Sequence, residues 1–138
     1  MNFITVLITV FTFFLFYLEK GKEKCIECAI FEASVNDEIF KREFFVCTNT
    51  SRTIMVHDKC NGIVKCRSQE VCSKIVRLVD KKADNELDPA TILLYRVDKT
   101  VHSMNMYFTR PYSGAAVMLQ FDFSSGKIVK EKHLIGSF

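Results

Sequence analysis

The strongest constraint on the fold is an alternation of residue types in the last third of the chain. From residue 115 to 123 every odd position is apolar, whereas Gln120 and Asp122 lie at even positions. Similar stretches cover Val101–Phe108 and Lys127–Ile135. Successive side chains of a strand point to opposite faces, so this period of two predicts antiparallel strands with one apolar face.

Helices and further strands are expected before this region. Apolar spacing predicts a helix over Ile26–Ser34, and Asn36 can cap a second helix that buries Ile39, Phe40 and Phe44. β-Branched residues predict strands over Thr53–His57 and Thr91–Val97.

A third helix is expected over Gln69–Lys82. Ser68 can act as its N-cap, and four apolar residues recur at helical spacing, namely Val71, Ile75, Leu78 and Val79. Helices followed by a run of strands indicate an α+β fold.

The N-terminus has the features of a targeting segment. Residues 3–18 carry no charge, and Lys20, Lys22 and Lys24 follow directly. The apolar run is longer than a typical signal-peptide core and shorter than the roughly 20 residues of a membrane span. We therefore expect residues 1–24 to be a signal peptide or signal anchor, and residues 25–138 to form one domain. The protein is expected to be secreted, or alternatively a single-pass membrane protein anchored through residues 3–18.

Six cysteines fall in the first half of the expected domain: Cys25, Cys28, Cys47, Cys60, Cys66 and Cys72. Behind a secretory leader, an even count predicts three disulfides, whose pairing the sequence leaves open. Cys25 and Cys28 have the C-x-x-C spacing of redox proteins, but without a preceding strand structural disulfides are the favoured interpretation. Asn49-Thr50-Ser51 is a glycosylation sequon, which fits the same compartment.

Several classes of function are disfavoured. The net charge of +3 comes from interspersed charged residues, and nucleic-acid binding usually leaves a clustered basic patch. The cysteine spacings match no zinc pattern, and no glycine-rich phosphate loop is present. We expect no nucleic acid, metal or cofactor.

The order of elements resembles the nuclear-transport-factor-2-like superfamily. The resemblance rests on Phe31–Phe45, on Thr53–Asp58, on Arg67–Leu78 in the place of the third helix, and on Phe121–Val129 as the final hairpin. It implies a cystatin-like cone, in which helices pack in the concave face of a curved antiparallel sheet. It also implies an apolar cavity and dimerisation through the outer face of the sheet.

The resemblance suggests one catalytic residue. In isomerases of this superfamily the acid at the position of Asp58 is the general base, and His102 is a candidate donor beside it. The tyrosine and the second acid of those isomerases correspond to Ala29 and Leu119, which cannot donate a hydrogen bond. A turn-initiating role for Asp58 is the alternative that we favour.

Apolar residues could line the cavity of the cone. The candidates are His57, Met104, Met106, Phe108, Leu119 and Phe121. A methionine-rich wall can adapt to a ligand, although core packing is the simpler explanation. We expect a non-catalytic domain that binds a small apolar ligand or a protein partner. An isomerase or dehydratase, and a cysteine-stapled interaction domain with a filled core, are the alternatives.

Overall fold

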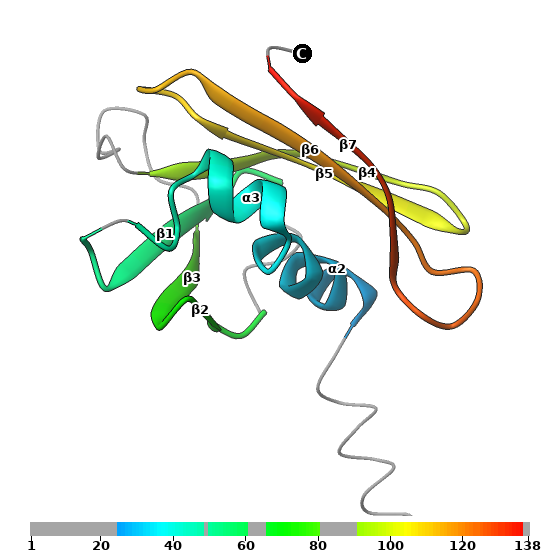
Figure 1. Ribbon diagram of the computed structural model, residues 1–138. Helices are drawn as coiled ribbons and strands as arrows, with labels where there is room; N and C mark the ends of the chain where they lie inside the picture. The colour runs from blue at the N-terminus through cyan, green and yellow to red at the C-terminus, as the bar shows by residue number, and fades with distance from the viewer. Residues whose placement is uncertain (1–24, 49, 61–65, 81–90, 137–138) are drawn as a thin grey trace, which may run out of the picture.

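The computed structural model of the protein describes residues 25–48, 50–60, 66–80 and 91–136 (Figure 1). The predicted leader and the sequon residue Asn49 therefore lie outside the described residues. Two helices and seven strands are described: α2 (Ile26–Val35), α3 (Glu38–Glu43), β1 (Thr53–Asp58), β2 (Gln69–Val71), β3 (Lys74–Asp80), β4 (Ile92–Lys99), β5 (Ser103–Arg110), β6 (Ala115–Asp122) and β7 (Val129–Ile135).

All seven strands belong to one sheet, in the order β2-β3-β1-β4-β5-β6-β7. β1 runs parallel to both β3 and β4, and the other neighbours are antiparallel. The sheet is therefore mixed, and the prediction of an antiparallel sheet is wrong at β1. Alternation tells which face a side chain occupies, but it carries no information on the direction of the neighbouring strand.

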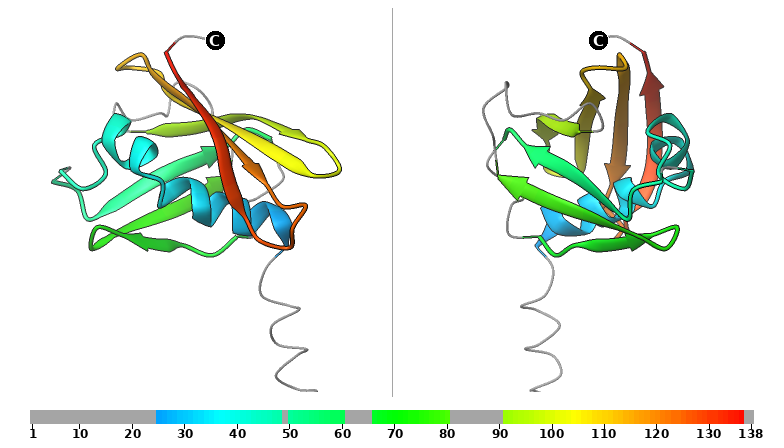
Figure 2. Two further views of the ribbon diagram at one scale, coloured as in Figure 1. Left: turned by 45° about the vertical axis from the view of Figure 1, so that its right-hand side comes forward. Right: turned by 90° about the vertical axis from the view of Figure 1, so that its left-hand side faces the viewer.

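The sheet curls into a half-barrel around the two helices (Figures 1 and 2). From the helices, Ile30, Phe31, Phe40 and Phe44 reach the core with no exposed surface. The ring of Phe40 packs edge-on against Phe44 at 4.8 Å between centroids, and against Phe108 of β5 at 5.0 Å. The expectation of an α+β fold with helices on the concave side of the sheet is confirmed.

The helices follow their sequence signals closely. α2 ends one residue beyond the predicted range. Asp37, not Asn36, caps α3, because its side chain accepts a hydrogen bond from the Ile39 N–H at 2.9 Å. The Asn36 amide instead donates to the Glu32 carbonyl at the end of α2.

The predicted third helix is wrong, because residues 69–80 form the β2–β3 hairpin. Cys72 and Ser73 make the turn with φ values of 53° and 64°, which is the left-handed pair that a tight hairpin requires. In β3, Val76 and Leu78 are buried, whereas Ile75 and Arg77 point to solvent. The apolar residues Ile75, Val76, Leu78 and Val79 fit the helical period and the strand period equally, and strand pairing decides between them.

Two disulfides attach the helices to this hairpin. Cys28 of α2 is bonded to Cys66, which precedes β2, and Cys47 after α3 is bonded to Cys72 in the β2–β3 turn. Cys25 and Cys60 are free thiols, so two of the three expected disulfides are present. Disulfides of this kind indicate an oxidising compartment. None of the described helices is long and apolar enough to span a bilayer.

Candidate functional site

The residues predicted to line a ligand cavity lie in the packed core. Met104, Met106, Phe108 and Leu119 are fully buried, and Phe121 is 4% exposed, all within one hydrophobic cluster that includes both helices. His57 is also buried, but it alternates with Val56 along β1 and so occupies the opposite face of the sheet. The structure therefore brings five of the six candidates together as core and separates His57 from them.

Asp58 and His102 are far apart. Asp58 is fully buried at the end of β1, and its Oδ1 accepts a hydrogen bond from the Cys60 N–H at 2.8 Å. It pairs with Leu94 in β4, which continues to Lys99 before the turn that carries the exposed His102. At about 3.3 Å per residue, at least ~16 Å of strand separates the two positions. One pocket cannot contain both side chains.

Two open hollows are lined by described residues, and both are on the surface. One, of about 400 Å³, lies between α2 and the β6–β7 turn and is lined by Ala29, Glu32, Ala33, Asn36 and Ile128. The other, of about 270 Å³, lies along α3 and is lined by Glu38, Lys41, Arg42, Phe45, Cys47 and Thr48. Neither hollow includes a residue predicted to contact a ligand.

An aromatic cluster occupies the outer face of the sheet. The β4–β5 register shifts between Leu94 and Arg96, so that Tyr95 and Arg96 lie opposite Tyr107 alone. The rings of Tyr95 and Tyr107 are 6.0 Å apart, and the Arg96 guanidinium lies 5.0 Å above the Tyr107 ring. The bulge thus places both Tyr95 and Arg96 next to Tyr107. In a regular strand, two successive residues would point to opposite faces of the sheet.

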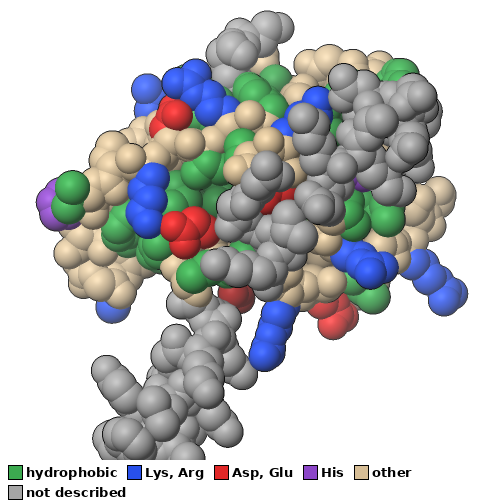
Figure 3. Space-filling model, turned by 180° about the vertical axis from the view of Figure 1, so that it is seen from behind, with side chains coloured by type: hydrophobic (Ala, Val, Ile, Leu, Met, Phe, Trp, Pro, Cys, Tyr) green, Lys and Arg blue, Asp and Glu red, His purple; other side chains and the backbone are tan. Residues whose placement is uncertain are grey.

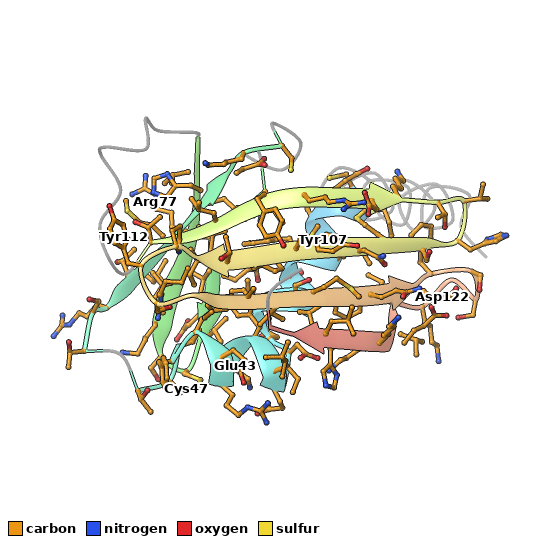
Figure 4. All side chains as sticks on the ribbon, turned by 90° about the horizontal axis from the view of Figure 1, so that it is seen from above. Glu43, Cys47, Arg77, Tyr107, Tyr112 and Asp122 are labelled. Atoms are coloured by element: carbon orange, nitrogen blue, oxygen red, sulfur yellow. A yellow bond between two sulfur atoms is a disulfide. The ribbon has the colours of Figure 1, made fainter. Side chains whose placement is uncertain are left out.

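This cluster continues across the sheet as a row of directly paired residues. Tyr107 lies opposite Met118 of β6, which in turn lies opposite Leu134 of β7. We call these residues the outer row: Tyr95, Arg96, Tyr107, Met118 and Leu134. Figure 4 looks onto this face and shows Tyr107 standing out from β5.

Electrostatic contacts fix the exposed end of the outer row. Asp98 forms an ion pair with Arg96 at 3.0 Å and, through this contact, raises the pKa of the guanidinium. Partial burial is the main cause that raises the pKa of Tyr95, and the neighbouring Tyr107 raises it further. The Tyr95 hydroxyl therefore stays protonated at neutral pH. The Oδ1 atom of Asn105, also in β5, is buried without a hydrogen-bond partner in the described part of the chain.

Sequence reasoning did not find the outer row. Leu94 and Val97 both face the core, so the two residues between them interrupt the alternation of β4. This interruption is the signal of a bulge that the sequence does contain. The pairing of Tyr107 with Met118 and Leu134 depends on register, which the sequence does not reveal.

The charged surface agrees with the interspersed sequence charges. Figure 3 shows Lys and Arg side chains intermixed with Asp and Glu over the rear face of the molecule. One example is the ion pair between Lys99 of β4 and Glu27 of α2, at 2.9 Å.

Comparisons with known proteins place the chain in no group: no family model, no curated protein and no solved structure matches it.

Proposed function

We propose that this protein is a secreted, non-enzymatic binding domain that contacts a protein partner through the outer row. In this proposal the chain is a divergent nuclear-transport-factor-2-like cone, whose interior is filled by its own helices. Residues 1–24 direct it into the secretory pathway, and Asn49 carries a glycan there.

The filled interior is the observation that carries the proposal. A ligand-binding cone needs side chains that border empty space. Here Met104, Met106 and Phe108 have no exposed surface and belong to one cluster with the helices. Of the two binding functions expected from the sequence, this packing favours the protein partner over the small apolar ligand.

An apolar probe tests the interior. We expect no saturable binding of benzene or xenon by the wild-type domain, measured by NMR shifts of the core methyl groups. Met106→Ala should create a dry cavity that binds the probe, because an unfilled apolar cavity of this kind takes up such molecules. Saturable probe binding in the wild-type core would instead favour the small-ligand function.

The composition of the outer row supports its role as the contact surface. Tyrosine and arginine are enriched in protein interfaces, where they often supply most of the binding energy. Arg96 is exposed, Leu134 is 41% exposed, and Tyr95 and Tyr107 are half-buried, whereas Met118 is only 3% exposed and packs beneath its neighbours. The row therefore offers apolar area and hydrogen-bonding groups together.

A photo-crosslinking experiment tests the surface. A photoreactive residue at Tyr107 should crosslink a specific extracellular protein, and Arg96→Ala should abolish the crosslink while leaving the melting temperature unchanged. The same photoreactive residue at Arg77, exposed on β3, is the matched control. Equal crosslinking from both positions, or none from Tyr107, would contradict the proposal.

A further inference from the structure

Three cysteine sulfurs meet at the start of α2. The Sγ atoms of Cys25, Cys28 and Cys66 all lie within 4.8 Å of one another. Cys28 and Cys66 are joined as a disulfide, and the Cys25 thiol is 3.1 Å from the Cys28 sulfur. A free thiol in contact with a disulfide is the arrangement from which thiol–disulfide exchange begins.

We propose that these residues form a thiol–disulfide exchange centre, in which Cys28 switches its disulfide partner between Cys66 and Cys25. The alternative isomer contains a Cys25–Cys28 disulfide across the first turn of α2 and a free Cys66.

The step conserves atoms and electrons. The Cys25 thiol loses its proton, and its thiolate attacks the Cys28 sulfur. The bond between Cys28 and Cys66 breaks, the new bond to Cys25 forms, and the electron pair leaves on the Cys66 sulfur, which then takes up a proton. One disulfide and one thiol are present before and after, so no external oxidant or reductant is required.

The start of α2 holds the Cys25 sulfur next to the disulfide. Cys25 is the N-cap, and its backbone carbonyl accepts the Ala29 N–H at 3.1 Å, which fixes it against the helix. The spacing of Cys25 and Cys28 is also the one at which a disulfide closes across a helical turn in C-x-x-C proteins.

The exchange would change how α2 is attached. In the described isomer α2 is covalently joined to the segment before β2 through Cys66. In the alternative isomer that link is absent, and α2 is held by packing of Ile30 and Phe31 in the core. In the described isomer Cys66 is only 9% exposed.

Disulfide mapping of the full-length protein tests the exchange. All samples carry Cys60→Ser, which removes the other free thiol. After long incubation at neutral pH, the protein is quenched in acid, unfolded, alkylated and mapped by mass spectrometry. We expect a Cys25–Cys28 peptide in the wild-type cluster at about 0.1–10% of the protein, the usual population of a minor state.

Two variants make the outcome decisive. Cys66→Ser, folded in an oxidising glutathione buffer that supplies the disulfide, should contain the Cys25–Cys28 disulfide, which shows that the bond forms and is detected. Cys25→Ser should contain the Cys28–Cys66 disulfide alone. If Cys66→Ser forms the bond but the wild-type cluster contains none, exchange does not occur and the proposal fails. If Cys66→Ser leaves both thiols free, the geometry itself is inadequate and the proposal also fails.

Discussion

At the scale of single residues, Phe45 combines two unfavourable conditions. Its side chain is 59% exposed, and its backbone has a φ of 53°, in the left-handed region. It follows α3, where its N–H donates to the Arg42 carbonyl and the next N–H, of Val46, donates to the Lys41 carbonyl. These two bonds form a Schellman motif, whose left-handed position is usually glycine.

Phe45→Gly should therefore stabilise the protein. Relief of the left-handed strain, which costs about 1–2 kcal/mol for a non-glycine residue, outweighs the added backbone entropy of glycine. We expect the free energy of unfolding in urea to rise by about 1 kcal/mol. Phe45→Ala, which keeps the strain and removes the ring, is the control and should leave stability nearly unchanged. A loss of stability in Phe45→Gly would show that the Phe45 ring makes an important packing contact.

Asp58 provides a second test at this scale. If Asp58 only accepts a hydrogen bond in the turn, an uncharged acceptor can replace it. If its negative charge is required, an uncharged acceptor cannot. Its Oδ1 accepts the Cys60 N–H, and the amide oxygen of an asparagine side chain would keep this acceptor. Asp58→Ala should lower the free energy of unfolding by about 1–3 kcal/mol, because a part-buried donor loses its acceptor. Asp58→Asn should lose much less in the same denaturation experiment. Equal losses in both variants would mean that the negative charge is required.

At the scale of elements, the ion pair between Glu27 and Lys99 joins the start of α2 to the end of β4. The hydrogen bond from Lys99 is the largest cause that lowers the pKa of Glu27 in the folded protein. A carboxyl whose folded pKa lies below its unfolded value adds stability above the unfolded pKa. That stability is lost as the pH falls through the folded pKa.

Lys99→Met should raise the pKa of Glu27 toward its ordinary value of 4.5. Carboxyl NMR titration of the folded protein measures the change directly. Because the pair is on the surface, we expect its effect on stability to stay below about 1 kcal/mol. Lys132→Met, on the edge strand β7, is the matched control and should leave the Glu27 titration unchanged. An unaltered Glu27 pKa in Lys99→Met would contradict this assignment.

The elements also differ in how clearly the sequence predicts them. α2, α3 and the strands β5 and β6 follow from periodicity, because each has a buried face and a matching pattern, whereas β7 carries the pattern but is exposed along its length. β3 does not, since its residues between Ile75 and Val79 fit both periods. The hairpin is decided by partners from elsewhere in the chain, namely β2 on one side and β1 on the other.

At the scale of the whole molecule, β1 is a central strand of the sheet. Val56, His57 and Asp58 pair with β3 on one side and with β4 on the other. β2 and β7 form the two edges of the sheet. Backbone amides in such an arrangement differ in the free energy needed to expose them.

Hydrogen exchange should follow this order of strands. We expect the amides of residues 56–58 and of β5 to exchange only on global unfolding. Those of β7 should exchange much faster, because an edge strand opens without disturbing the core. Exchange followed by NMR under native conditions measures both groups in one sample. Protection of β7 equal to that of β1 would indicate that the β7 edge is covered in solution, as a sheet-to-sheet dimer would cover it.

The sequence by itself determined which side chains of most elements are buried, because burial imposes a period that the chain must carry. It also indicated the oxidising compartment through its cysteines. Only the tertiary structure decided the parallel pairing of β1, the filling of the half-barrel by Phe31, Phe40 and Phe44, and the register behind the outer row. These features depend on contacts between residues that are distant in sequence, and a local sequence pattern does not specify which distant residues come into contact.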